Sequence, residues 1–267
     1  MASSNPAFTN SPAFSNRRGA VDAYLAQPAG TQTVGAQQLD AMYDRPSATP
    51  ADTDRMSYED TIVKTAISFG ILVVGAVVGW AVPVLALPAA LIGFVLALVN
   101  IFKKKPSPGL ILTYAAIEGV FVGGISQYFA GAYAGIVQQA VLATLVVVGV
   151  TLALFANGKI RASAKATKIF MIAMVGYLVF SLLNFGLTAF GVLDGFGMRS
   201  GPLGIVIGLL VVVMAAYSLV LDFDNVQTGV RRGAPRIYGW TAAFGIMVTV
   251  VWLYMEILRL FAIIRGQ

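Results

Sequence analysis

The sequence contains no cysteine and no histidine, two residue types on which much protein chemistry depends. The absence of cysteine excludes disulfides, thiolate nucleophiles and cysteine-ligated zinc or iron–sulfur sites. The absence of histidine excludes Ser-His and Cys-His catalysis and removes both the commonest metal ligand and the usual titrating group near neutral pH. Any response to pH must therefore come from carboxyl groups.

Charged residues are also scarce, because they make up only 11% of the 267 residues, whereas 58% are hydrophobic. The mean hydropathy is +0.80. A soluble domain of this length cannot bury so much apolar surface. The composition therefore predicts an all-α integral membrane protein that crosses the bilayer several times.

Residues 1–58 differ from the rest of the chain, because they are polar, rich in proline and alanine, and show no helical or strand periodicity. A short repeat, Asn5 to Phe8 and Ser11 to Phe14, lies within this segment. We expect a disordered tail, which serves either to solubilise the chain or to bind a partner through the repeat. No apolar core follows the start, so the segment does not resemble a signal peptide.

From Thr61 onward the sequence alternates between long apolar runs and short loops. A spanning helix needs about 20 apolar residues. Seven segments meet this requirement: 61–81, 84–102, 109–129, 134–156, 167–190, 202–222 and 239–263. The sequence therefore predicts a seven-transmembrane-helix bundle over residues 59–267, preceded by the tail.

The distribution of basic residues predicts the orientation of this bundle. Alternate loops carry ten basic residues: Lys103, Lys104, Lys105, Lys159, Arg161, Lys165, Lys168, Arg231, Arg232 and Arg236. The opposite side carries only Arg199 and Arg265. Because basic loops stay on the cytoplasmic side, we expect a multi-pass protein of the cell membrane with a cytoplasmic N-terminus and an extracytoplasmic C-terminus.

Pairs of glycines four residues apart occur in three of the apolar segments: Gly75/Gly79, Gly119/Gly123 and Gly204/Gly208. Such pairs allow two helices in lipid to approach closely. They are also common by chance in glycine-rich membrane chains, so the sequence alone does not say which helices they join.

Acidic residues are rarer still in the membrane part, which has only five after residue 60. Asp194 is typical of an ordinary loop, but Glu118, Asp222, Asp224 and Glu256 lie in or beside apolar segments. A carboxylate in hydrocarbon is costly, which makes such residues functional candidates.

Glu118 falls near the middle of the third segment, with Tyr114 one helical turn earlier as its expected hydrogen-bond partner. A protonated structural glutamate is the equal alternative. Asp222 and Asp224 end the sixth segment and project about 200° apart on a helix, so they cannot face the same cavity. We interpret Asp222 as functional and Asp224 as a solvated acid that pairs with Arg231 or Arg232.

Glu256 lies well inside the seventh segment, where Arg259 at i+3 offers an intrahelical ion pair. Alternatively, Glu256 faces Asp222, and the two carboxyls share a proton and act as a proton-controlled latch. The stretch from Asp222 to Gly229 fails the EF-hand pattern, because Val226 stands where an oxygen ligand is needed. The sequence therefore assigns no metal ligand set.

Three stretches resemble a known family. The run from Tyr217 to Phe223, followed by a basic loop and by Leu253 to Phe261, resembles the C-terminal signature of the Bax inhibitor-1 family. The stretches Tyr114 to Phe121 and Trp240 to Gly245 are similar to its high-GC Gram-positive bacterial branch. The resemblance covers about residues 59–267 and leaves the tail outside.

The resemblance implies seven spans and an acidic pair that acts as the pH-sensing latch of a calcium leak path. Carried over by position, this role falls on Asp222 and Glu256. An undistorted helix from Tyr238 would place Glu256 roughly 27 Å further along, away from Asp222. The two acids can therefore meet only if the seventh helix begins later, near Ala243.

We therefore expect a pH-sensitive calcium or cation leak channel or transporter, with calcium as the transported ion and no cofactor. The alternative is a membrane regulatory or interaction protein without intrinsic transport, such as a modulator of stress survival or of a membrane protease. It would bind its membrane-protein partner through the tail and the basic loops. A proton-coupled antiporter would use the same residues. An enzyme is disfavoured, because no Gly-x-Gly-Asp motif surrounds Asp222. The basic loops suit anionic lipid rather than nucleic acid.

Overall fold

A computed structural model describes residues 54–103 and 105–266 of the chain. Seven helices in this part are long and apolar enough to cross a membrane. They are α4 (Tyr58–Ala81), α5 (Ala86–Phe102), α6 (Pro108–Ala132), α7 (Ile136–Ala156), α8 (Ala164–Ala189), α9 (Gly201–Arg231) and α10 (Gly239–Arg265). Three short 3-10 turns, η1 (Pro83–Leu85), η2 (Gly197–Arg199) and η3 (Arg236–Tyr238), precede α5, α9 and α10. No strand occurs in the described ranges, so the prediction of an all-α protein with seven membrane-spanning helices is confirmed.

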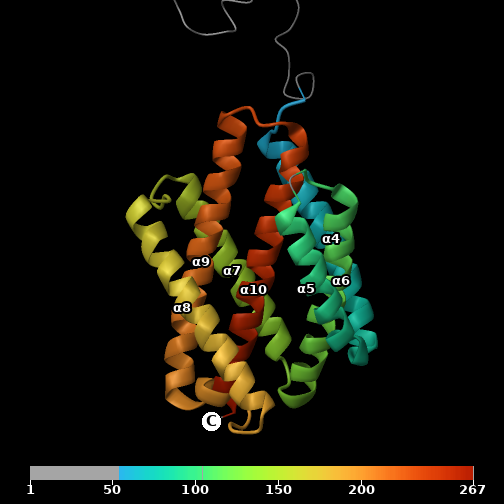
Figure 1. Ribbon diagram of the computed structural model, residues 1–267, viewed down its shortest axis with the longest axis vertical. Helices are drawn as coiled ribbons and strands as arrows, with labels where there is room; N and C mark the ends of the chain where they lie inside the picture. Colours follow the sequence, from blue (N-terminus) through green and yellow to red (C-terminus); the bar gives the residue numbers. More distant parts are fainter. Residues whose placement is uncertain (1–53, 104, 267) are drawn as a thin grey trace, which may run out of the picture. The chain divides into compact units, whose positions relative to one another are not determined.

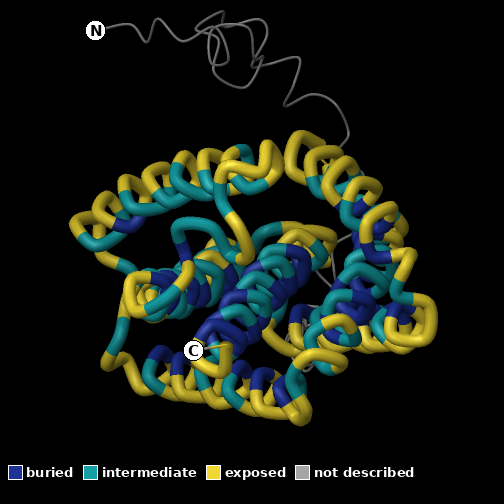
Figure 2. The backbone as a smooth tube through the Cα atoms, turned by 90° about the horizontal axis from the view of Figure 1, so that it is seen from below, coloured by how far each residue is buried: buried dark blue, intermediate teal, exposed yellow. Residues whose placement is uncertain are grey.

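Helix α10 forms the centre of the bundle, with α4, α6, α7 and α9 packed around it (Figure 1). Seen along the helices, α10 is largely buried, whereas the surrounding helices expose their outward faces (Figure 2). Its fully buried side chains include Met247, Leu253 and Leu258. Helix α8 lies at the edge and is the most exposed of the seven. The C-terminal sequence signature therefore belongs to the best-packed element.

Glycines join α4 to α6, as the small-residue pattern predicts. A Cβ added to Gly75 or Gly79 would overlap a backbone carbonyl of α6, and one added to Gly119 or Gly123 would overlap a carbonyl of α4. The two backbones can approach this closely only because side chains are absent there. The third pair behaves differently, because Gly204 packs against the backbone of Arg199 in the preceding loop.

Helix α9 is longer than the sequence predicts, because it continues past residue 222 to Arg231. It ends in a Schellman motif: Gly233 has a positive φ of 62°, and Ala234 donates its backbone N–H to Gly229 O at 3.0 Å. Glycine is the residue that adopts this left-handed conformation without strain. The chain becomes polar after residue 222 but stays helical to Arg231, so Asp222 and Asp224 lie inside a continuous helix.

The N-terminal tail as predicted, residues 1–58, falls mostly outside the described residues, but its last part is folded. Residues 54–57, here called the strap, run antiparallel to the α9–α10 loop. Met56 N–H donates to Ala234 O at 2.7 Å, and Arg236 N–H donates to Asp54 O at 2.8 Å. Met56 is buried. The folded part therefore begins before residue 59, because backbone pairing with the loop holds the strap in place.

The predicted charge separation corresponds to the two ends of the bundle. The α5–α6, α7–α8 and α9–α10 connections, which carry the predicted basic residues, lie at the end where α4 begins (Figure 1). Arg199 and Arg265 lie at the opposite end. The protein is thus a multi-pass membrane protein, and one end of its helix bundle is strongly basic.

Candidate functional site

The first polar cluster lies between α9 and α10, towards the basic end. Thr249 Oγ1 donates a hydrogen bond to Asp222 Oδ2 at 2.6 Å. Ser218, one turn before Asp222, has its hydroxyl 3.4 Å from that of Thr249. No Lys or Arg in the described part of the chain forms an ion pair with Asp222. Asp222 is therefore a carboxyl group held by a hydroxyl alone.

Asp222 also lines a cavity of about 510 Å³ at the basic end of the bundle. The walls come from the end of α5, the α5–α6 connection, α9 and α10 and include Asn100, Lys103, Lys105 and Asn225. Asp222 is the only acid among the described residues that line this cavity. A Cβ on Gly245 would lie 3.3 Å from Asp222 Oδ1, so this glycine leaves space beside the carboxyl. The cavity thus connects an intramembrane carboxyl with the region of the basic loops.

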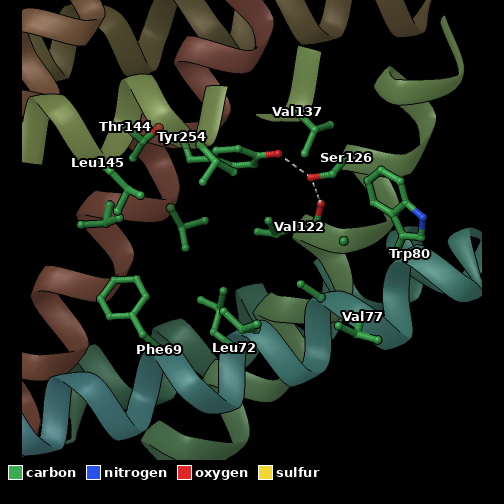
Figure 3. Close-up of a pocket in the computed structure, with 16 residues that line it drawn as sticks. Phe69, Leu72, Val77, Trp80, Val122, Ser126, Val137, Thr144, Leu145 and Tyr254 are labelled. Atoms are coloured by element: carbon green, nitrogen blue, oxygen red, sulfur yellow. Dashed lines mark hydrogen bonds between the residues drawn. The ribbon is translucent and has the colours of Figure 1, made fainter. Parts of the chain in front are cut away.

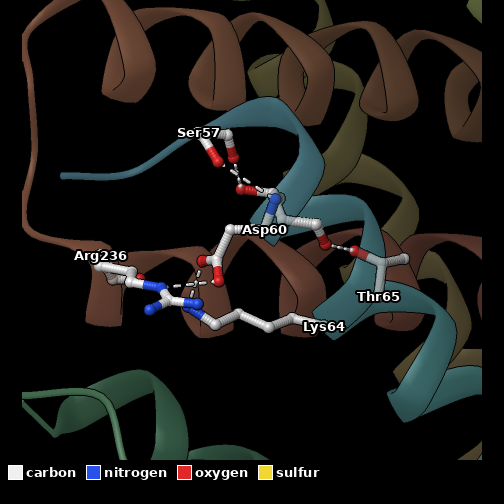
Figure 4. A network of polar contacts seen from close by, with 6 residues as sticks. Ser57, Asp60, Lys64, Thr65 and Arg236 are labelled. Carbon is white, nitrogen blue, oxygen red and sulfur yellow. Dashed lines mark hydrogen bonds and ion pairs between the residues drawn. The ribbon is translucent and has the colours of Figure 1, made fainter. Parts of the chain in front are cut away.

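The strap borders the same cavity, because Met56 is one of its lining residues. A polar network just beyond the strap fixes its position (Figure 4). Asp60 receives bonds from Lys64 Nζ at 2.5 Å and from Arg236 Nε at 2.8 Å, and Lys64 Nζ also donates to Arg236 O at 2.7 Å. Asp60 was not among the candidates from sequence. Its carboxylate joins the first turn of α4 to the α9–α10 loop.

The second polar cluster lies in the opposite half of the bundle, around Glu256. Arg199 Nη2 donates to Glu256 Oε2 at 2.6 Å, and Arg259 Nη1 donates to Oε1 at 3.1 Å. Tyr177 O–H donates to Oε1 at 2.5 Å and accepts from Arg199 Nη1 at 2.9 Å. Glu256 and Arg199 are 3% and 4% exposed. This is a buried ion pair joining α10 to the α8–α9 loop and α8.

The α8–α9 loop folds inward to bring Arg199 to this position. Gly197 adopts a positive φ of 63°, and Asn184 Oδ1 accepts the backbone N–H of Met198 at 2.7 Å. Burial opposes the charge of Arg199, but the carboxylate of Glu256 outweighs it and holds the pKa of the guanidinium above its usual range. Arg199 is thus an internal cation rather than a surface charge of its loop.

The structure does not bring Asp222 and Glu256 together. Helix α10 begins at Gly239, so the interpretation in which it starts near Ala243 is wrong. Asp222 meets Thr249, which precedes Glu256 by seven residues, or about 10.5 Å along the helix. The intrahelical contact with Arg259 is present. Each acid therefore has its own partners, and the expected carboxylate pair is replaced by two separate clusters.

Four residues of these clusters, Tyr177, Arg199, Ser218 and Thr249, were not among the candidates from sequence. The available signals were weak: Arg199 is the only basic residue in its loop, and Thr249 is one of few hydroxyl residues in an apolar run. Between the clusters lies an apolar layer that includes Ala215, Leu219 and Leu253, all with no exposed surface. In this structure the apolar layer separates the Asp222 cavity from the Glu256 cluster.

The remaining candidates lie apart from both clusters. Glu118 is half-buried on α6 and faces α5, where a Cβ on Gly93 would lie 3.1 Å from its Oε2. Tyr114 lies near Glu118, but its ring packs edge-on against Phe244 with centroids 5.1 Å apart. Asp224 forms no ion pair within the described residues, so the expected pairing with Arg231 or Arg232 is not formed.

Each of the two clusters contains one acidic residue, Asp222 or Glu256. Across residues 54–103 and 105–266, no group of three or more acidic residues is close enough to hold a metal ion. In the first cluster the carboxyl group of Asp222 contacts a hydroxyl group, and in the second the carboxyl group of Glu256 contacts one hydroxyl and two guanidinium groups.

Comparison with known proteins places this architecture in a family. A search of curated proteins found no match. The family described as Bax inhibitor 1 like matches residues 5–266, nearly the whole chain. The match includes most of the tail, which the sequence resemblance had left outside. The chain therefore belongs to the Bax inhibitor 1 like family of membrane proteins.

Proposed function

We propose that this protein is a pH-sensitive leak pathway for calcium or other cations, with Asp222 as the proton-controlled group. The supporting observation is a carboxyl group without a basic partner among the described residues, which lines a cavity of about 510 Å³ at the basic end of the bundle. In apolar surroundings the charged form of such a group needs a counter-charge, which is either a proton or a cation. Proton and cation thus compete for one carboxyl.

The Glu256 cluster serves as the second barrier in this proposal. Arg199 and Arg259 together place two positive charges around one carboxylate. A cation that has passed the apolar layer meets this positive charge, which opposes its passage. Opening therefore requires the Arg199–Glu256 contact to move away from the path. Glu256 keeps a role in gating, through a partner different from the one that the sequence suggested.

Lys103 and Lys105 line the same cavity as Asp222 and are exposed. Positive charge at the mouth of a path lowers the local concentration of cations. This arrangement favours a slow leak over a fast channel. It also agrees with a cytoplasmic location of the basic end, and hence with a cytoplasmic N-terminus in the cell membrane.

The test is calcium flux into liposomes that contain the purified chain, measured across a pH series. We expect the Asp222→Asn variant to lose the pH dependence of the wild type. Asp224→Asn is the matched control, because Asp224 lies on the same helix but does not line the cavity. Equal pH dependence in all three proteins would contradict the assignment of Asp222.

A membrane regulatory protein that binds another membrane protein is the second candidate. It is supported by the family match, which begins at residue 5 and so includes residues of the tail, and by the pairing of the strap with the α9–α10 loop. Deletion of residues 1–53 distinguishes the two functions, since it leaves the strap and both clusters intact. A leak pathway should keep its flux after this deletion, whereas a tail-mediated function would be lost.

A further inference from the structure

A long apolar crevice runs along the bundle between α4 and α7. Two cavities, of about 620 and 450 Å³, share the lining residues Phe69, Leu145 and Val250 and are therefore adjacent to each other. Helix α10 packs against both α4 and α7, which make few contacts with each other. The lining residues of α4 run from Tyr58 to Trp80, a length of about 33 Å. This length is close to the thickness of the hydrocarbon core of a bilayer, about 30 Å.

The crevice is open to the side of the bundle. Leu145 and Leu152 of α7 and Ile62 of α4 line it and are exposed. Figure 3 shows the half beyond Phe69, where Trp80 lies at one end and the Tyr254 hydroxyl lies 2.6 Å from Ser126 Oγ. Ser126 Oγ donates to Val122 O at 2.6 Å and accepts from the Tyr254 hydroxyl, so this half offers hydrocarbon contacts rather than a charged group. The side opening gives acyl chains direct access.

The other half of the crevice begins at the basic end, beside Arg161. Its Nη1 donates to Gln227 Oε1 at 2.9 Å, and its guanidinium lies 4.7 Å from the ring centre of Phe155. Gln227 and Phe155 both line the crevice. These contacts hold the guanidinium group of Arg161 at the mouth of the apolar crevice. A guanidinium has five N–H donors in a planar fork that matches a phosphate group.

We propose that this half of the crevice is a binding site for one acyl chain of an anionic phospholipid, whose phosphate contacts Arg161. From Tyr58 to Phe69 the lining of α4 covers about 16 Å, which is the depth of one leaflet. At Phe69 the acyl chain reaches the junction with the second cavity. Charge complementarity selects the occupant, because a neutral lipid or an apolar helix has no net negative charge for Arg161. The proposal is independent of ion transport.

The test titrates the full-length protein in detergent with phosphatidylglycerol or phosphatidylcholine and counts bound lipids by native mass spectrometry. Arg161→Gln removes the headgroup contact. Lys159→Gln removes a neighbouring charge that, among the described residues, forms no hydrogen bond or cation–π contact with Gln227 or Phe155. Ala66→Phe fills the crevice, and Ala153→Phe adds the same ring at an exposed site of α7 outside it. Size-exclusion profiles and helical circular dichroism verify the fold of each variant.

We expect one tightly bound phosphatidylglycerol, preferred over phosphatidylcholine, in the wild type and in both control variants. Arg161→Gln should weaken this binding by about 5- to 10-fold, the effect of one basic residue on an anionic lipid. Ala66→Phe should abolish it. Equal binding in all five proteins overturns the proposal. Loss in Arg161→Gln but not in Ala66→Phe also overturns it, because the lipid would then bind the surface without entering the crevice.

Discussion

Replacing Glu256 by Gln removes the negative charge from a cluster that contains two guanidinium groups. Arg199 cannot reach solvent easily, because its side chain is 5% exposed. Its Nε already lies buried without a hydrogen-bond partner among the described atoms. The Glu256→Gln variant would thus hold a buried cation without its counter-charge.

The expected cost follows from this burial. Breaking a buried ion pair by removing one partner typically destabilises a protein by about 3–5 kcal/mol. Arg199→Met should cost less, about 2 kcal/mol, because Glu256 keeps its bonds to Arg259 and Tyr177. Replacing both members by Met should leave stability within about 2 kcal/mol of the wild type, since no uncompensated charge remains.

The assay is thermal or denaturant unfolding of the purified protein in detergent at neutral pH, followed by circular dichroism. Arg259→Met is the matched control, because its side chain is 30% exposed and its pair with Glu256 is partly screened. We expect a loss of less than about 1 kcal/mol for this control. If Glu256→Gln is no less stable than Arg259→Met, the description of a buried, coupled cluster is wrong. The same conclusion follows if the double variant loses as much as Glu256→Gln alone.

Three further predictions concern other contacts. Gly79→Ala should destabilise the protein by about 1–3 kcal/mol, because a Cβ there overlaps the carbonyl oxygen of Val120 on α6. Gly70→Ala on the same helix is the control, because its Cβ would lie in open space. Equal unfolding midpoints for the two variants would contradict the packing. Asp60→Asn should speed proteolytic cleavage near the strap, because it loses the ion pairs with Lys64 and Arg236. Glu59→Gln, a change at the exposed neighbouring residue, is the control, and equal cleavage rates in the two variants would refute the role of Asp60. Tyr177→Phe should lower stability by about 1–3 kcal/mol, because its hydroxyl bridges Arg199 and the carboxylate; an unchanged unfolding midpoint would show that the bridge contributes nothing.

The helices themselves could be predicted from the sequence because apolar length is a local property. Each predicted span coincides with a helix, and the largest error is at the end of α9. There the chain leaves the apolar region at Asp222 while the backbone stays helical to Arg231. Hydropathy reports the position of the bilayer, whereas the end of the helix is set by Gly233, whose left-handed backbone a hydropathy profile does not register.

The side-chain partners were harder to predict because they depend on where each helix begins. A later start of α10 would have left Glu256 free to face Asp222, but the start at Gly239 turns Thr249 to that carboxyl instead. Arg199 was not recognised as a partner of Glu256, because a basic residue in a loop is normally solvated. Its inward position depends on the Gly197 conformation and on Asn184, which lies on a different helix. Such long-range contacts leave no periodic signal in the sequence.

The proposed leak depends on one carboxyl group, Asp222, to make cation flux respond to pH. The most direct measurement is the rate of calcium uptake by liposomes with the wild-type protein and with Asp222→Asn, over a pH range that spans the titration of carboxyl groups. We predict pH-dependent uptake in the wild type and pH-independent uptake in the variant. Wild-type protein that is folded but gives no uptake above empty liposomes at any pH would contradict the proposed function.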